Sequence, residues 1–286
     1  MTKLASMFVV SIWIVSSNSH GIAAMLYGVT GDQLESKNPV NPEMLFTVST
    51  TDASTTFIQS FGNGDDGESI AFNSHDGLLY HWSGFDDGKI METVNLSDQS
   101  ITNVPFDVTA HEPPDVFGST YDPSSGEFLI TDRKWDMIKV SPEGKFSLIG
   151  PMELENRGLA LVDDLLYAGA KESATLSQLD PSNGATLSTV SVTLSGYTVA
   201  GILGLDTDPD TGTLYGIIRT GQINTRVGRR LGTIDPNTGI ATDIGPLPKG
   251  FANIAFIPEP STLVLVAWSV LTFLLHRSPN CRHVVH

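Results

Sequence analysis

The sequence predicts an all-β protein: a β-propeller of about five four-stranded blades, preceded by a signal peptide and followed by a short apolar helix. Three observations lead to this prediction. Turn-forming residues separate short apolar runs, a two-hairpin phrase recurs about every 40–50 residues, and the two ends of the body each hold half of that phrase. The expected domains are residues 1–24, 25–257 and 258–286.

Composition narrows the class of protein. Hydrophobic residues make up 40% of the 286 residues and charged residues 17%, which is too apolar for a disordered chain and too polar for a polytopic membrane protein. The formal charge of −16 repels phosphate backbones and therefore argues against nucleic acid as a partner. The single cysteine, Cys281, excludes a disulfide framework and a cysteine zinc site.

The N-terminus has the layout of a secretory signal peptide. Lys3 precedes an apolar run over residues 7–15, and small residues follow up to Ala23 and Ala24. Nine apolar residues are too few to span a bilayer, which takes ~20. We therefore expect residues 1–24 to be removed and the body to be exported.

Two hairpin phrases alternate through the body. The clearest copy of the first runs over residues 204–216 and joins two apolar strands through Asp208-Pro209 and Gly212; the best copy of the second runs over residues 231–245. Proline presets φ for the turn, aspartate accepts local hydrogen bonds, and glycine supplies a positive φ where the second strand begins. The first strands begin near residues 69, 118, 158, 202 and 252, a period typical of propeller blades.

The ends of the body predict how the ring closes. Residues 26–29 match a second strand without its first, and residues 252–256 match a first strand without its second. Pairing these strands completes a fifth blade and removes two exposed sheet edges. The alternative architecture is a β-sandwich or double sheet.

The C-terminus carries a tripeptide, an apolar run and a basic residue in that order. Pro258-Glu259-Pro260 precedes the apolar residues 263–275, and Arg277 follows them. This arrangement resembles the PEP-CTERM sorting signal. The resemblance implies recognition by an exosortase, a membrane transpeptidase, with residues 263–275 in the inner membrane until processing. It also implies a destination at the cell surface, outer envelope or extracellular matrix. The alternative is an ordinary C-terminal membrane anchor.

The repeats bear a resemblance of their own. Asp180-Pro181 and Asp235-Pro236, each followed by a glycine, look like the Asp-Pro-x-Thr-Gly propeller repeats common in exported bacterial proteins. Without residues 1–24 and 261–286, the body keeps 13 basic and 32 acidic residues, a formal charge of −19, and no cysteine. Its stability therefore depends on core packing alone.

Carboxylates in loops suggest cation sites. Asp65-Asp66 and Asp86-Asp87 could together bind calcium if their loops approach each other, and solvated turn carboxylates are the alternative. Carboxylates also alternate at Asp206, Asp208 and Asp210, but the position twelve residues into that loop is Ile217 rather than glutamate. We therefore expect an ordinary hairpin turn there.

One loop combines charge with an aromatic residue. Trp135 could stack on a sugar ring while Asp132 and Arg133 bond its hydroxyls; an exposed loop with a packed tryptophan is the alternative. No catalytic motif is present, and we expect no enzyme activity. The functional prediction is an exported, non-enzymatic binding or scaffold propeller, associated with exopolysaccharide by the sorting-signal resemblance. The alternative is a secreted propeller hydrolase or lactonase with a divalent-metal site.

Overall fold

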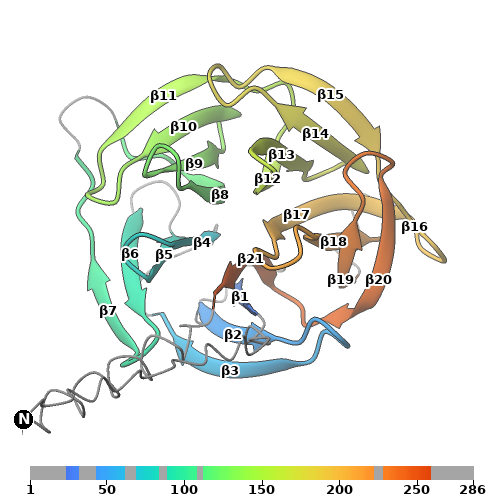
Figure 1. The fold of residues 1–286 in the computed structure, drawn as a ribbon, viewed down its shortest axis with the longest axis horizontal. Coiled ribbons are helices and arrows are strands. Elements are labelled where there is room, and N and C mark those ends of the chain that lie inside the picture. The colour runs from blue at the N-terminus through green and yellow to red at the C-terminus, as the bar shows by residue number, and fades with distance from the viewer. Residues whose placement is uncertain are drawn as a thin grey trace, which may run out of the picture. The chain divides into compact units, whose positions relative to one another are not determined.

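The computed structural model describes residues 24–31, 43–61, 69–83, 89–107, 112–221 and 228–258. These residues form one compact unit of mainly antiparallel sheets arranged as a ring of five blades (Figure 1). The predicted all-β class and the five-bladed propeller are confirmed. Residues 1–23 of the predicted signal peptide, Glu259, Pro260, the apolar run 263–275 and Arg277 lie outside the described residues. Within the described part of the chain there is no helix, hence none that could cross a membrane.

Each blade begins with a strand near the central axis and ends with a strand on the outer rim (Figure 1). The blade that closes the ring is counted as the first. The second blade consists of β4 (Ser69–Asn73), β5 (Leu78–Ser83), β6 (Ile90–Asn95) and β7 (Ser100–Asn103). The third consists of β8 (Val116–Asp122), β9 (Glu127–Asp132), β10 (Asp136–Val140) and β11 (Phe146–Pro151). The fourth is β12 (Asn156–Val162), β13 (Leu165–Ala170), β14 (Thr175–Leu179) and β15 (Thr186–Ser191).

The closing blade combines both ends of the body, as the split phrase predicts. It contains β21 (Phe251–Ile257), β1 (Met25–Thr30), β2 (Met44–Val48) and β3 (Thr55–Ser60), in that spatial order. Strands β1 and β21 are antiparallel, with Leu26 opposite Phe256 and Gly28 opposite Ile254. The chain therefore closes the ring with a strand from each end.

The fifth blade departs from the four-stranded prediction. It contains β17 (Val199–Thr207), β18 (Leu214–Thr220), β19 (Arg229–Ile234) and β20 (Ile240–Leu247), and a short β16 (Thr193–Leu194) adds to its edge. Strand β16 is parallel to β20, and the Thr193 amide donates to the Gly239 carbonyl at 2.9 Å. Leu194 is buried there, so the connection from the fourth blade covers an edge that would otherwise lie open.

The turns form by the mechanism expected from their sequence. The backbone amides of Ser182 and Asn237 donate to the carboxylates of Asp180 and Asp235 at 2.8 and 2.9 Å. In both turns the glycine four residues after the aspartate donates its amide to the aspartate carbonyl, and its φ is positive, +79° and +71°. The repeated aspartate and glycine therefore serve the turn geometry.

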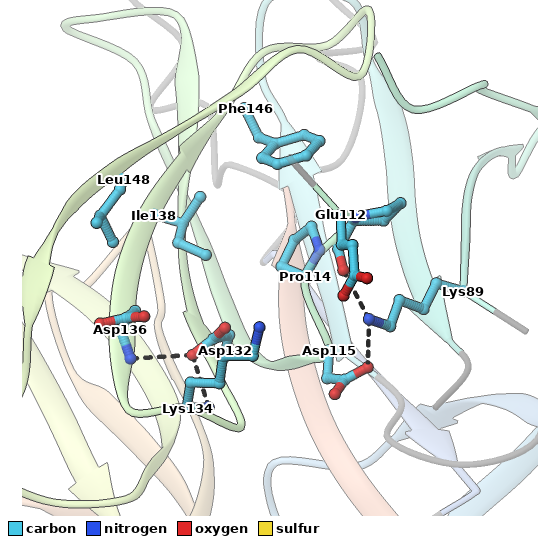
Figure 2. A pocket seen from close by; sticks show the side chains of 11 residues that line it. Lys89, Glu112, Pro114, Asp115, Asp132, Lys134, Asp136, Ile138, Phe146 and Leu148 are labelled. Carbon is cyan, nitrogen blue, oxygen red and sulfur yellow. Dashed lines mark hydrogen bonds and ion pairs between the residues drawn. The ribbon is translucent and has the colours of Figure 1, made fainter. Parts of the chain in front are cut away.

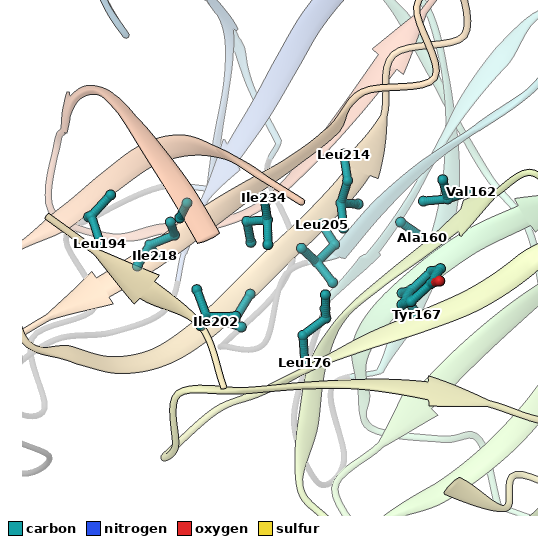
Figure 3. Packing of buried hydrophobic residues seen from close by; sticks show 12 residues of the cluster. Ala160, Val162, Tyr167, Leu176, Leu194, Ile202, Leu205, Leu214, Ile218 and Ile234 are labelled. Carbon is teal, nitrogen blue, oxygen red and sulfur yellow. The ribbon is translucent and has the colours of Figure 1, made fainter. Parts of the chain in front are cut away.

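The core lies between neighbouring blades. Figure 3 shows the cluster between the fourth and fifth blades, where Tyr167 and Leu176 of one blade pack against Ile202 and Leu205 of the next. Closer to the axis the first strands approach so tightly that a side chain has no room. A Cβ on Gly204 would lie 2.9 Å from the Asn253 Cα, and one on Gly118 would lie 2.6 Å from the Arg157 carbonyl oxygen.

Candidate functional site

A pocket of about 310 Å³ lies between the second and third blades. Its residues come from the position just before β6, the connection that leads into β8, the end of β9 and the β9–β10 turn, and strands β10 and β11 (Figure 2). The lining comprises Lys89, Glu112, Pro113, Pro114, Asp115, Asp132, Lys134, Asp136, Ile138, Phe146 and Leu148. The volume falls at the lower end of the range for small-ligand pockets, ~300–1,000 Å³.

An ion pair connects the two blades at the base of this pocket. The Lys89 Nζ lies 3.0 Å from a carboxylate oxygen of Asp115 and donates to the Pro113 carbonyl at 2.7 Å (Figure 2). Both side chains are largely buried. The backbone amide of Arg133 also donates to the Asp115 carbonyl at 3.1 Å. These contacts hold the β9–β10 turn against the connection that enters β8, so the base of the pocket is preformed.

Asp132 organises the β9–β10 turn. One of its carboxylate oxygens accepts the backbone amides of Lys134 at 2.8 Å and Asp136 at 2.9 Å. Burial of the carboxyl raises the pKa of Asp132, although these two hydrogen bonds favour the charged form. Trp135 adopts a left-handed φ of +66° at the tip of the turn. The Asp132 side chain therefore shapes the pocket through the backbone.

Two charged side chains of this turn are available to a ligand. Lys134 and Asp136 both line the pocket, and within the described part of the chain neither the ammonium nor the carboxylate makes a hydrogen bond or ion pair. One group donates hydrogen bonds and the other accepts them. A ligand with adjacent hydroxyls could use both.

The opposite wall of the pocket is apolar. Ile138, Phe146 and Leu148 extend from β10 and β11 on the side of the pocket away from Lys89, and Pro114 of the connection faces Ile138 (Figure 2). Phe106 packs edge-on against Phe146, with ring centroids 6.1 Å apart and planes at 88°. Leu148 is 60% exposed, so much of its apolar surface is open to a ligand. The pocket thus has an apolar wall and a polar base.

The three residues predicted to bind a ligand are only partly brought together here. Asp132 lines the pocket, whereas Arg133 and Trp135 are exposed on the same turn and are not among its lining residues. Trp135 is 46% exposed, and sugar stacking on it stays a prediction. The sequence reasoning missed Lys89, Asp115 and Phe146, because they come from other strands and belong to no local motif.

The predicted calcium ligands Asp65, Asp66, Asp86 and Asp87 lie outside the described residues, so the calcium site stays a prediction. In the part of the chain that the structure describes, no three histidine, cysteine or acidic side chains are grouped to hold a metal. The alternating carboxylates near residue 208 form a hairpin turn, as expected. There the Asp210 amide donates to the Asp208 carboxylate at 2.9 Å and the Gly212 amide donates to the Asp208 carbonyl at 2.8 Å.

His81 of β5 is fully buried between the first and second blades. Its Nδ1 lies 2.9 Å from Glu92, its Nε2 lies 3.8 Å from Glu43, and its ring stacks on Phe61 at 4.1 Å. Ser83 donates a hydrogen bond to Glu43. The cluster joins two blades, and its burial leaves a substrate no access to the imidazole.

A second cavity, of about 150 Å³, is lined by residues of β4, β8, β17 and β21, the strands nearest the central axis (Figure 1). The turns after β4, β8 and β17 contribute Ser74, Pro123 and Pro209, and Pro258 lines the same cavity. Asp206 lies there and accepts the backbone amides of Phe256 and Thr207. Burial raises the pKa of Asp206 to about 7.

Comparison with known proteins supports the fold. No protein-family model matches the sequence, and no curated protein sequence matches it. A protein of unknown function from Bacteroides caccae is 12% identical, with a TM-score of 0.51 over 83% of this chain and 100% of its own. A chain of a nidogen/laminin complex is 13% identical, with a TM-score of 0.50 over 82% of this chain and 98% of its own. At such identities these likenesses show the fold alone.

Proposed function

We propose that this chain is an exported, non-enzymatic propeller that binds a polysaccharide and is placed on the cell surface or in the extracellular matrix by its C-terminal signal. The observation that carries the binding role is the pocket between the second and third blades. It combines an apolar wall with a lysine and a carboxylate that have no hydrogen bond or ion pair of their own within the described residues.

A sugar ring matches this combination chemically. A pyranose presents C–H groups on its faces and hydroxyls around its edge, and each hydroxyl both donates and accepts hydrogen bonds. The face packs on Phe146 and Leu148, while neighbouring hydroxyls donate to Asp136 and accept from Lys134. A pocket of about 310 Å³ holds only the end of a polysaccharide or one short stretch of it. The proposed ligand is therefore a saccharide unit of a polymer.

The sequence supports the route of export and sorting. Residues 1–24 have the layout of a signal peptide, and Pro258-Glu259-Pro260, the apolar residues 263–275 and Arg277 resemble the PEP-CTERM signal. The proposed processing partner is an exosortase-type transpeptidase. Mass spectrometry of surface material tests this step. We expect no peptide from residue 263 onward, and intact peptides across residues 263–275 in the mature protein would contradict it.

Titration with oligosaccharides, followed by calorimetry, tests the pocket. The chain offers a matched pair of variants, because Leu148 on β11 and Leu187 on β15 are 60% and 59% exposed on the outer strands of adjacent blades. Only Leu148 lines the pocket. We expect Leu148→Ala and Asp136→Asn to weaken saccharide binding and Leu187→Ala to leave it unchanged.

The alternative, a hydrolase or lactonase with a divalent metal, gives a different outcome in the same experiment. It predicts metal-dependent turnover of the added compound, which calorimetry records as continued heat release. Equal affinity in the Leu148→Ala and Leu187→Ala variants would remove the pocket from the proposal. If the added compound is turned over and this turnover stops when a chelator removes the metal, the protein is an enzyme and the binding proposal is wrong.

A further inference from the structure

The charged end of the pocket and the second cavity lie at opposite ends of the same strand. Phe146, which is paired with Val140, extends the pocket along the blade toward the end where the second cavity lies. Asp115, immediately before β8, lines the pocket between the second and third blades, and Pro123, immediately after β8, lines the cavity at the axis. The seven residues of β8 span about 23 Å at ~3.3 Å per residue. We call the end of the blades with Ser74, Pro123 and Pro209 the turn face and the opposite end the pocket face.

Both ends of the propeller leave from the turn face. Met25 and Ile257 are paired at the outer ends of β1 and β21, and Pro258 lines the turn-face cavity beside Pro209. In the uncleaved chain, the Ala24 amide donates to the carboxylate of Asp210, in the same turn as Pro209, at 2.8 Å. Whichever end of the chain carries an attachment, the attachment reaches the propeller at the turn face.

The connection to the apolar segment is short. Four residues separate Pro258 from residue 263, and the fully extended chain between these two positions reaches only about 18 Å. This reach is less than the distance of about 23 Å along β8 between the two faces. A propeller held through residues 263–275 therefore keeps its turn face near the attachment surface.

We propose that the turn face is the attachment face and that the pocket face is directed away from the surface that holds the chain. The proposal depends on the proposed function, because it requires the C-terminal segment to attach the protein. In this orientation a polysaccharide reaches the pocket from the solvent and does not have to enter the space between the propeller and the attachment surface. The partner of the turn face is the lipid surface that holds residues 263–275 before processing.

The absence of cysteine from the body makes the orientation measurable. With Cys281→Ser in the tail, Asn237→Cys places one dye in a turn-face hairpin and Glu153→Cys places one in the connection between β11 and β12 on the pocket face. Both side chains are exposed, and matching melting curves would show that neither variant disturbs the fold. The full chain is reconstituted into phosphatidylcholine vesicles whose headgroups carry an energy acceptor.

We expect the vesicles to float with the protein and energy transfer from position 237 to exceed that from position 153 several-fold. Phosphatidylcholine has no net charge, so electrostatic repulsion between the acidic turns and the lipid does not determine the orientation. Equal transfer from the two positions, or greater transfer from position 153, would overturn the orientation and leave export and sorting intact. A chain that does not float with the vesicles would refute the attachment itself, and the orientation with it.

Discussion

The closing blade makes a quantitative prediction about stability. Leu26 of β1 and Ile254 of β21 are each 1% exposed and belong to one apolar cluster that also includes Leu203 and Ile217 of the fifth blade. Truncation of such a side chain to alanine costs about 2–5 kcal/mol of unfolding free energy, from lost transfer energy and the cavity that remains. For a domain of this size each kcal/mol lowers the Tm by about 2–4 °C.

Leu26→Ala and Ile254→Ala should therefore each lower the Tm by about 4–20 °C. Thermal unfolding followed by circular dichroism measures this, with chemical denaturation as a second measure of the free energy. Leu187→Ala is the control, because a 59% exposed residue on the outer strand should change the unfolding free energy by no more than about 0.5 kcal/mol. If Ile254→Ala melts together with the Leu187→Ala control, the two ends of the chain do not close the ring.

Two further predictions concern the axis of the propeller. The pKa of Asp206 rises from 3.8 to about 7 on folding, so the native state holds this proton more tightly than the unfolded chain. The resulting stabilisation is present below pH 3.8 and is lost as the pH rises through 7. The Tm of Asp206→Asn should therefore rise relative to that of the parent between about pH 4 and pH 7, and a constant difference would refute the shift. Gly204→Ala should lower the unfolding free energy by about 1–3 kcal/mol in chemical denaturation, because the added Cβ would lie 2.9 Å from the Asn253 Cα. The control Thr189→Ala, at an exposed position, should leave the unfolding free energy unchanged. If the two variants have the same denaturation midpoint, the inner strands have room to separate.

Local chemistry made the blades predictable from the sequence. The aspartate and the glycine of each turn act within five residues, so their repetition located the hairpins before any packing was known. The same logic found the closure, since a strand that lacks its partner must pair with the other unpaired strand. Strand β16 was not found, because Thr193 and Leu194 extend the sheet only by meeting β20, a contact that no local pattern encodes.

The pocket depends on contacts between blades and was therefore out of reach of the sequence. Lys89 and Asp115 meet across two blades at 3.0 Å, and neither belongs to a repeated phrase. The loop around residue 135 was singled out because it joins charges to an aromatic side chain. Its turn does border the pocket, but the residues that line it from that turn are Asp132, Lys134 and Asp136. Trp135 at the tip of this turn has a left-handed φ of +66°, which the sequence did not indicate.

A crystal structure of the chain with a bound oligosaccharide tests the central claim most directly. We expect a sugar ring against Phe146 and Leu148, with adjacent hydroxyls bonded to Asp136 and Lys134. A sugar bound elsewhere on the propeller, or an empty pocket at a saccharide concentration that saturates binding in solution, would contradict it.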